Sequence, residues 1–145
     1  MVCDEPVSAL DVSIQAQVLN LFADLRERIS IACIFISHDL GVVERLSDRV
    51  AVMYLGRIVE VANKSALFDV AKHPYTQMLL AAVPKIGRHR KGTVEISGER
   101  PSALDPPRGC HFHPRCPRAM KRCREAAPEL REVAPGQLAA CHLYD

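Results

Sequence analysis

Two acids and a histidine supply the first chemistry that the sequence offers. Asp4 and Glu5 directly follow the apolar pair Val2-Cys3, and His38 directly follows a second apolar stretch, residues 31–37. Carboxylates can hold a divalent cation or accept a proton, and a histidine can exchange a proton near neutral pH. Taken singly, each also has an ordinary interpretation: adjacent acids as solvated loop charges or a helix cap, and a lone histidine as a structural residue.

Four cysteines in the last third of the chain form a second pattern. They are separated by five, six and seventeen residues: Cys110, Cys116, Cys123 and Cys141. This spacing differs from the paired arrangement of zinc ribbons and leaves open a four-thiolate metal site, structural thiols or disulfides. Zinc and iron–sulfur clusters both accept thiolates, so the spacing does not choose between them. His111, His113 and His142 flank the cysteines and could replace one ligand, whereas we expect Cys3 and Cys33 to be inert buried thiols.

The stretches around the acids and the histidine predict an α/β arrangement. Val2-Cys3 is typical of the end of a buried parallel strand, and residues 31–37 of a strand covered on both faces. Between them, Asp11 is a good N-cap for an amphipathic helix of about seventeen residues. A short helix follows His38. Because ligands bind at the carboxyl ends of parallel strands, we expect the acids and the histidine at one such edge.

The following stretch alternates strands and helices. Residues 49–62 predict two strands around a turn at Gly56. Ser65 is a candidate cap for a small helix that ends at Val70. Pro74 is well placed as the first residue of another helix, which we expect to end at Ala82.

Charge and proline content divide the chain near residue 83. Residues 1–83 carry seven Lys and Arg against ten Asp and Glu, whereas residues 84–145 carry twelve against seven, together with eight of the ten prolines. We therefore expect two domains with these bounds. The basic run Pro84–Gly92 could contact RNA or anionic lipid, and we interpret it as a solvated linker. No aromatic residues interleave with it, so a platform that stacks on nucleic-acid bases is not supported. The second part has few large apolar residues, so a small hydrophobic core is expected there, and this favours a structural metal site that stabilises it.

The sequence also predicts a compartment. No targeting segment precedes the first acids, and the longest apolar run, residues 29–37, is about half as long as a bilayer span. We expect a cytosolic protein. In a reducing compartment, metal binding is a better explanation of clustered cysteines than disulfides.

In this order, the motifs resemble the second half of an ABC transporter ATPase domain. "CDEPVSALD" resembles the Walker B end and the D-loop, and "FISHD" resembles the strand end with the switch histidine. "RVAVMYLGRIVEVA" and "HPYTQMLLAAVP" are similar to the ATPase subunits of oligopeptide and dipeptide importers, and "CDEPVSALDVSIQAQV" is most similar to the second of their two ATPase subunits. The resemblance covers the whole chain and implies the C-terminal part of a P-loop NTPase parallel sheet, followed by a small cysteine-rich extension.

The resemblance also implies roles for individual residues. ATP hydrolysis depends on charge neutralisation around Mg²⁺ and on a group that orients the attacking water. By resemblance, Asp4 helps to hold Mg²⁺, Glu5 is the general base, and His38 hydrogen-bonds the γ-phosphate. The loop from Ser8 to Asp11 would cross the interface with a second ATPase subunit.

The cysteine segment is part of the same resemblance. "GCHFHPRCPRAMKRC" with the later "CHL" is similar to the C-terminal extension of peptide-importer ATPase subunits. In that extension four cysteines are understood to bind a [4Fe–4S] cluster, and all four match here. The resemblance thus implies this cluster as a cofactor, with Zn²⁺ as the alternative that spacing leaves open.

Several expected motifs do not occur in these 145 residues: a GxxxxGK[ST] phosphate loop, a glutamine loop and an LSGGQ signature. All of them would precede Asp4, so we expect the C-terminal portion of a longer ATPase subunit, unable to turn over ATP alone. The implied partners are a second ATPase subunit, membrane permease subunits and, indirectly, a substrate-binding protein, with no nucleic acid. The implied location is the cytoplasmic face of the cell membrane. The rival hypotheses are a standalone metal-stapled regulatory module without ATPase activity and, more weakly, a nucleic-acid-binding cysteine module.

Overall fold

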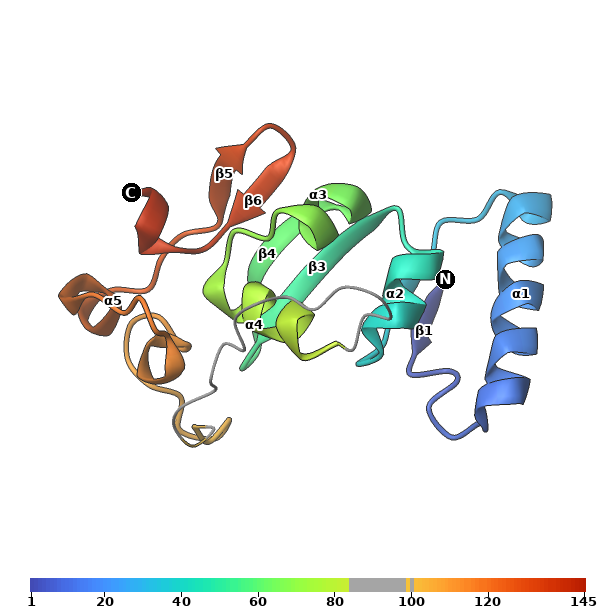
Figure 1. Cartoon of the computed structure of the whole chain (residues 1–145), viewed down its shortest axis with the longest axis horizontal. Coiled ribbons are helices and arrows are strands. Elements are labelled where there is room, and N and C mark those ends of the chain that lie inside the picture. Colours follow the sequence, from blue (N-terminus) through green and yellow to red (C-terminus); the bar gives the residue numbers. More distant parts are fainter. Residues whose placement is uncertain (84–98, 100) are drawn as a thin grey trace. The chain divides into compact units, whose positions relative to one another are not determined.

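The computed structural model describes residues 1–83, 99 and 101–145 and has a mixed α/β fold. The chain forms two compact units, Met1–Asp48 and Arg49–Asp145 (Figure 1). The predicted linker Pro84–Gly92 lies outside the described residues. Within the described ranges, no helix is both long enough and apolar enough to cross a lipid bilayer.

The first unit follows the predicted order of strand, helix, strand and helix. Its elements are β1 (Val2–Asp4), α1 (Val12–Ile29), β2 (Ile34–Ile36) and α2 (Leu40–Leu46). The two strands pair in parallel, with Cys3 opposite Phe35 and Asp4 opposite Ile36. Asp11 caps α1 as expected, because its Oδ1 accepts the Ile14 amide at 3.0 Å.

One face of this strand pair is packed and the other is open. Val7, Leu19 and Val42 form the buried core, and Phe35 reaches it from β2 and packs edge-on against Phe22 of α1 at a centroid distance of 5.6 Å. On the opposite face, the side chains of Val2, Ile34 and Ile36 are exposed. The prediction of strands covered on both faces is therefore wrong for the described part of the chain, in which helices cover one face only.

The second unit contains an antiparallel sheet of strand order β3-β4-β6-β5. Its strands are β3 (Arg49–Tyr54), β4 (Arg57–Asn63), β5 (Arg131–Ala134) and β6 (Gln137–Ala139). The predicted turn at Gly56 is present, with positive φ at Leu55 (43°) and Gly56 (76°), as in the turns that suit hairpins. The strands β5 and β6 lie in the C-terminal segment, residues 101–145, which we call the tail, and were not predicted. They complete a sheet that begins before residue 83, and the predicted domain boundary there remains a prediction.

Short helices accompany this sheet: α3 (Lys64–Asp69), α4 (Pro74–Ala82), α5 (Lys121–Glu125) and the single 3₁₀ turns η1 (His113–Arg115) and η2 (His142–Tyr144). Pro74 is the first residue of α4, as predicted. The predicted cap at Ser65 is wrong: α3 begins at Lys64 directly after β4, and its N-cap Asn63 makes no side-chain cap bond.

An aromatic cluster joins the sheet of this unit to the cysteine segment. Tyr54, from the end of β3, lies 4.6 Å from Tyr75 of α4 and 5.3 Å from Phe112, measured between ring centroids. Phe112 is almost completely buried, at 1% exposure, and also contacts His73. A ring between two cysteines thus anchors the tail to the sheet.

Candidate functional site

Parallel pairing of β1 and β2 brings the acids and the histidine to one edge, as predicted. Asp4 and Glu5 lie at the end of β1, and the Glu5 amide donates to the Ile36 carbonyl at 3.0 Å, which extends the pairing by one residue. His38 lies two residues after Ile36, just beyond the end of β2. The carboxyl ends of both strands therefore present their polar side chains together.

Glu5 and His38 are in direct contact. His38 Nδ1 lies 3.0 Å from Glu5 Oε1, and both side chains are largely solvent-accessible, at 75% for His38 and 47% for Glu5. The hydrogen bond to Glu5, reinforced by the charge of the carboxylate, raises the pKa of His38 above 6.5. The imidazolium form of His38, which pairs with the Glu5 carboxylate, is therefore lost as pH rises through the raised pKa of His38.

The turn after Glu5 is tightly held. Glu5 has a φ of 42°, a left-handed conformation that is uncommon for residues other than glycine and that concentrates at functional sites. The Ser8 hydroxyl and the Ser8 amide both donate to the Glu5 carbonyl, at 3.0 and 3.2 Å. Ser8 therefore fixes the backbone that aims the Glu5 side chain, and Asp11 fixes the start of α1 beyond it.

A small cleft opens beside the Glu5–His38 pair. It has a volume of about 100 Å³ and is lined by Glu5, Val7, Ser8, Gln15, Ser37, His38 and Asp39. Ligand pockets for whole organic molecules usually measure about 300–1,000 Å³, so this cleft suits a water or a phosphoryl group rather than an entire nucleotide. Sequence reasoning missed Gln15, whose position one turn into α1 was its only signal.

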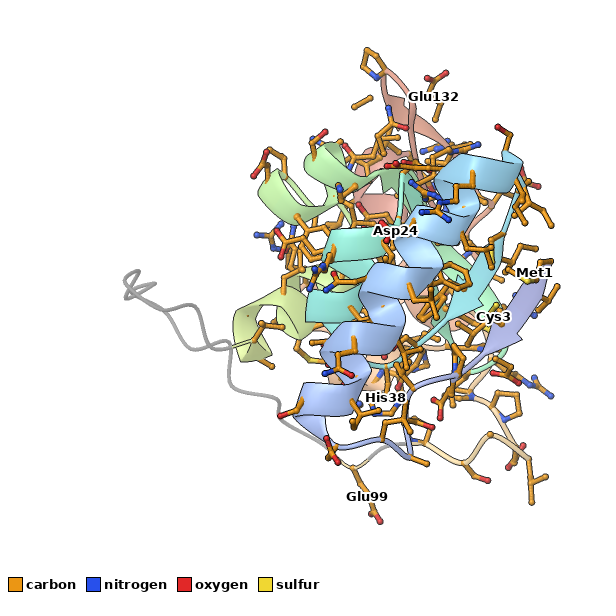
Figure 2. All side chains as sticks on the ribbon, turned by 90° about the vertical axis from the view of Figure 1, so that its right-hand side faces the viewer. Met1, Cys3, Asp24, His38, Glu99 and Glu132 are labelled. Atoms are coloured by element: carbon orange, nitrogen blue, oxygen red, sulfur yellow. The ribbon has the colours of Figure 1, made fainter. Side chains whose placement is uncertain are left out.

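Asp39 is engaged in helix capping. Its Oδ1 accepts the amides of Gly41 and Val42 at 2.8 and 3.3 Å, and its own amide donates to the Ser37 hydroxyl at 3.1 Å. These bonds hold the His38 backbone between β2 and α2 and position the imidazole toward Glu5. Figure 2 shows His38 within this first unit, together with Cys3 on β1.

Cys3 and Cys33 are less buried than we expected. Both are half-buried, and their sulfur atoms lie 3.7 Å apart. Burial, and then the contact with Cys33, raises the pKa of the Cys3 thiol. Sequence reasoning missed this contact, because nothing in the sequence shows the register in which β1 pairs with β2.

The four tail cysteines lie in one neighbourhood. The Cys110 amide donates to the Cys123 carbonyl at 2.8 Å. Burial is the main cause that raises the pKa of Cys110, Cys116 and Cys141. The pKa of Cys141 is raised to about 11. The charges of the other three sulfurs raise the pKa of Cys141 further, which places all four within electrostatic range of one another.

These thiols do not converge on one point. All six cysteines are free thiols, so the disulfide alternative is not what the structure contains. Among the residues that the structure describes, no three His, Cys, Asp or Glu side chains are grouped so as to hold a metal ion. The predicted metal centre is therefore not confirmed.

The flanking histidines are engaged in other hydrogen bonds. His111 Nδ1 lies 3.2 Å from the Leu55 carbonyl, and His113 Nδ1 lies 2.9 Å from the Cys110 carbonyl. Both ring nitrogens of His142 have acceptors, the Asp145 carboxylate at 2.5 Å and the Ala126 carbonyl at 2.9 Å. His142 therefore has no ring nitrogen left for a metal.

A buried carboxylate that sequence reasoning missed connects the tail to α4. Glu60 is completely buried in β4 and accepts three N–H bonds: from the amides of Lys72 and His73 at 2.7 and 2.9 Å, and from Gln137 Nε2 at 2.9 Å. The Tyr144 hydroxyl donates to the Lys72 carbonyl at 2.9 Å. A glutamate within an apolar strand was the available signal.

His73 belongs to the same network. Its Nδ1 accepts the Tyr75 amide at 3.1 Å and so caps α4, which requires an imidazole without a proton on that nitrogen. Burial lowers the pKa of His73 to about 4, so the ring is neutral at physiological pH. Segments far apart in the sequence therefore meet at the start of α4.

Comparison with known proteins gives one consistent result. Residues 59–123 match the family "Oligopeptide/dipeptide transporter, C-terminal region". The chain is 52% identical over 147 residues to the oligopeptide transport ATP-binding protein AppF of Bacillus subtilis, covering 99% of this chain and 45% of that protein. It is 49% identical over 146 residues to the dipeptide transport ATP-binding protein DppF of Escherichia coli, covering 100% of this chain and 43% of that protein.

A third relative agrees. The probable peptide ABC transporter ATP-binding protein y4tS of Sinorhizobium fredii is 55% identical over 145 residues, covering 99% of this chain and 41% of that protein. The chain thus spans less than half the length of these relatives, and the similarity runs through both compact units rather than through the tail alone. Over nearly its whole length, the chain is therefore similar to ATP-binding proteins of oligopeptide and dipeptide ABC transporters.

Proposed function

We propose that this chain belongs to an ATP-binding subunit that drives peptide import, and that the carboxyl ends of β1 and β2 are where this subunit hydrolyses ATP. The observation that carries the proposal is the Glu5–His38 contact of 3.0 Å at the ends of two parallel strands. The adjoining cleft of about 100 Å³ suits a water or a phosphoryl group. Relatives whose names specify oligopeptide or dipeptide transport support the substrate class.

Each residue of this edge has a distinct task in the proposal. Glu5 accepts the proton of the hydrolytic water. Its Oε1 is hydrogen-bonded to His38, so the second carboxylate oxygen, Oε2, serves as the base. His38 uses its other ring nitrogen, Nε2, to donate to a γ-phosphate oxygen. Asp4, exposed at the end of β1, would help to hold Mg²⁺, and the ion would neutralise phosphate charge.

The loop between β1 and α1 is proposed to contact a second ATPase subunit. Ser8, Ala9, Leu10 and Asp11 are all exposed. The bonds of Ser8 to Glu5 and of Asp11 to α1 hold this loop in one conformation. A rigid exposed loop that starts at the catalytic carboxylate can couple the two subunits. Membrane permease subunits at the cytoplasmic face, served by a substrate-binding protein, complete the proposed assembly.

The polypeptide of these 145 residues is not expected to hydrolyse ATP by itself. Its sequence contains no GxxxxGK[ST] phosphate loop and no LSGGQ signature, and backbone amides with a lysine normally cradle the phosphates. We therefore propose that activity requires these elements from the remainder of an ATPase domain.

A transport assay tests the proposal. Residues 1–145 would replace the matching C-terminal part of the dipeptide transport ATP-binding protein of Escherichia coli, with which they share 49% identity. This chimaera would be expressed in a strain that lacks the native protein. The expected result is dipeptide uptake that Glu5→Gln abolishes and that Glu44→Gln, at an exposed acid on α2, leaves intact. Uptake that survives Glu5→Gln would contradict the assigned base.

We also propose that Cys110, Cys116, Cys123 and Cys141 hold an iron–sulfur cluster of the [4Fe–4S] type. Their mutual electrostatic effect supports a common site. Each thiolate of such a cluster binds a different iron atom, so the sulfurs need not converge on one point as they do around zinc. The bound group would supply metal–thiolate bonds that close the tail.

Metal analysis tests the cluster separately. Anaerobic purification should yield about four iron and four acid-labile sulfide per chain. Cys116→Ser should lower this content, and Cys33→Ser, in the other compact unit, should not. A colourless protein with one zinc per chain would refute the cluster.

A further inference from the structure

Two thiols outside the proposed cluster face each other behind the Glu5–His38 edge. Cys3 lies on β1, two residues before Glu5, and Cys33 directly precedes β2. Their sulfur atoms are 3.7 Å apart, and both side chains are half-buried rather than enclosed in the core. The proposed function uses neither thiol.

The strand pairing fixes the positions of the two residues. Cys3 pairs with Phe35, and the amide of Ile34 donates to the Met1 carbonyl at 2.9 Å, so Cys33 lies opposite Met1. The two cysteines are therefore two positions out of register on the same face. A strand spacing of about 4.8 Å and a rise of about 3.3 Å per residue put their Cα atoms about 8 Å apart.

This arrangement disfavours a direct disulfide. Disulfides usually join Cα atoms within about 4.4–6.8 Å and need a sulfur–sulfur bond of about 2.04 Å. Bridging through one additional atom is a better match. Two sulfurs bound to one tetrahedral metal centre, with bonds of about 2.3 Å, lie about 3.8 Å apart, close to the 3.7 Å observed between Cys3 and Cys33.

We propose that Cys3 and Cys33 form a chelating dithiol site for a single soft, thiol-binding metal or metalloid atom, for which a trivalent arsenical serves as the probe. An organic arsenic oxide reacts with two thiols without any change of oxidation state. The two S–H bonds and the arsenic–oxygen double bond break, two arsenic–sulfur bonds form, and the oxygen leaves as water. The product ties β1 to β2 directly before Asp4 and Glu5.

Phenylarsine oxide added to the full 145-residue chain tests this site. Peptide mapping by mass spectrometry should find one phenylarsenic group bridging the peptides that contain Cys3 and Cys33, separate from any adduct on the tail cysteines. Ethanedithiol should remove the group, and an equal concentration of a monothiol should not. A bridge absent from these two peptides would overturn the proposal.

A relocated thiol provides the matched control. Cys33→Ser should weaken phenylarsine binding at Cys3 by about 10²-fold, because the second sulfur then no longer acts at high effective concentration. Combining Cys33→Ser with Ala32→Cys keeps the thiol count but turns the sulfur to the other face, and should not restore binding. Restoration by this variant would overturn the proposal. Melting curves of both variants verify that the first unit remains folded.

An oxidation experiment tests the preference for a one-atom bridge. Incubation with oxidised glutathione should yield mixed disulfides between glutathione and Cys3 or Cys33. A dominant intramolecular disulfide between Cys3 and Cys33 would show that the strands bring the sulfurs together directly, and would refute the chelating geometry.

Discussion

Replacing Glu60 by glutamine should destabilise the second unit strongly, although the substitution preserves shape. Glu60 Oε1 accepts the Lys72 amide and Gln137 Nε2, and Oε2 accepts the His73 amide. Glutamine keeps one acceptor oxygen and places an NH₂ group against one of these donors. One charge-assisted bond is lost, at about 1.5–3 kcal/mol, and the others lose their charge assistance.

The sum is about 3 kcal/mol at a site with 0% exposure, where water cannot replace the lost acceptor. For a unit of this size, this corresponds to a fall in melting temperature of more than about 10 °C. Intrinsic tyrosine fluorescence during urea unfolding reports on this unit, because Tyr54, Tyr75 and Tyr144 all belong to it and the chain has no tryptophan.

The matched control is Glu129→Gln, the same substitution at an exposed acid of the same unit. It should change stability by less than about 0.5 kcal/mol. If Glu60→Gln were no more destabilising than Glu129→Gln, the buried network would not hold the tail as described. A double-mutant cycle with Gln137→Ala should give a coupling energy of about 1 kcal/mol or more.

Three further predictions concern single residues. Gly109→Ala should destabilise the tail by more than about 2 kcal/mol, because the φ of Gly109 is +72° and a Cβ there would lie 2.4 Å from a carbonyl oxygen. Gly136→Ala, at a φ of +70° where no described residue other than its chain neighbours lies within 4 Å of the added Cβ, should cost only about 1 kcal/mol. Equal losses of stability for the two variants in urea unfolding would refute the clash at Gly109. Glu5→Gln should lower the pKa of His38 toward 6.5 in an NMR titration, whereas an unchanged pKa would refute the contact. Because the pKa of His73 is lowered to about 4, stability that is complete above pH 6.5 should decline as pH falls toward 4, and His73→Asn, which keeps a capping oxygen, should flatten this decline; an unaltered pH profile would contradict the neutral cap.

Local signals predicted the parts of the fold that local chemistry determines. The carboxylate of Asp11 can satisfy a free helix amide wherever α1 starts, and Pro74 suits a first helical turn in any context. The edge that joins Glu5 and His38 followed from one general rule on parallel strands. At Ser65 the same reasoning failed, because α3 begins directly at the end of β4 without a side-chain cap.

Long-range pairing is what the sequence did not reveal. β5 and β6 are four and three residues long, too short for a periodic pattern. β6 forms by pairing with β4, which is far away in the sequence, and β5 forms by pairing with β6. Glu60 and Gln137 are 77 positions apart, and each has a buried partner only because of this pairing. The contact between Cys3 and Cys33 depends in the same way on the register of β1 and β2.

The assignment of Glu5 as the base for ATP hydrolysis is tested most directly by separating nucleotide binding from turnover. The purified chimaera of residues 1–145 with the remainder of the Escherichia coli relative would be assayed for both. Glu5→Gln should lower the turnover rate by about 10²-fold or more and leave ATP affinity within about twofold, because a general base acts on the water and not on the bound nucleotide. Turnover that Glu5→Gln leaves unchanged would contradict the account.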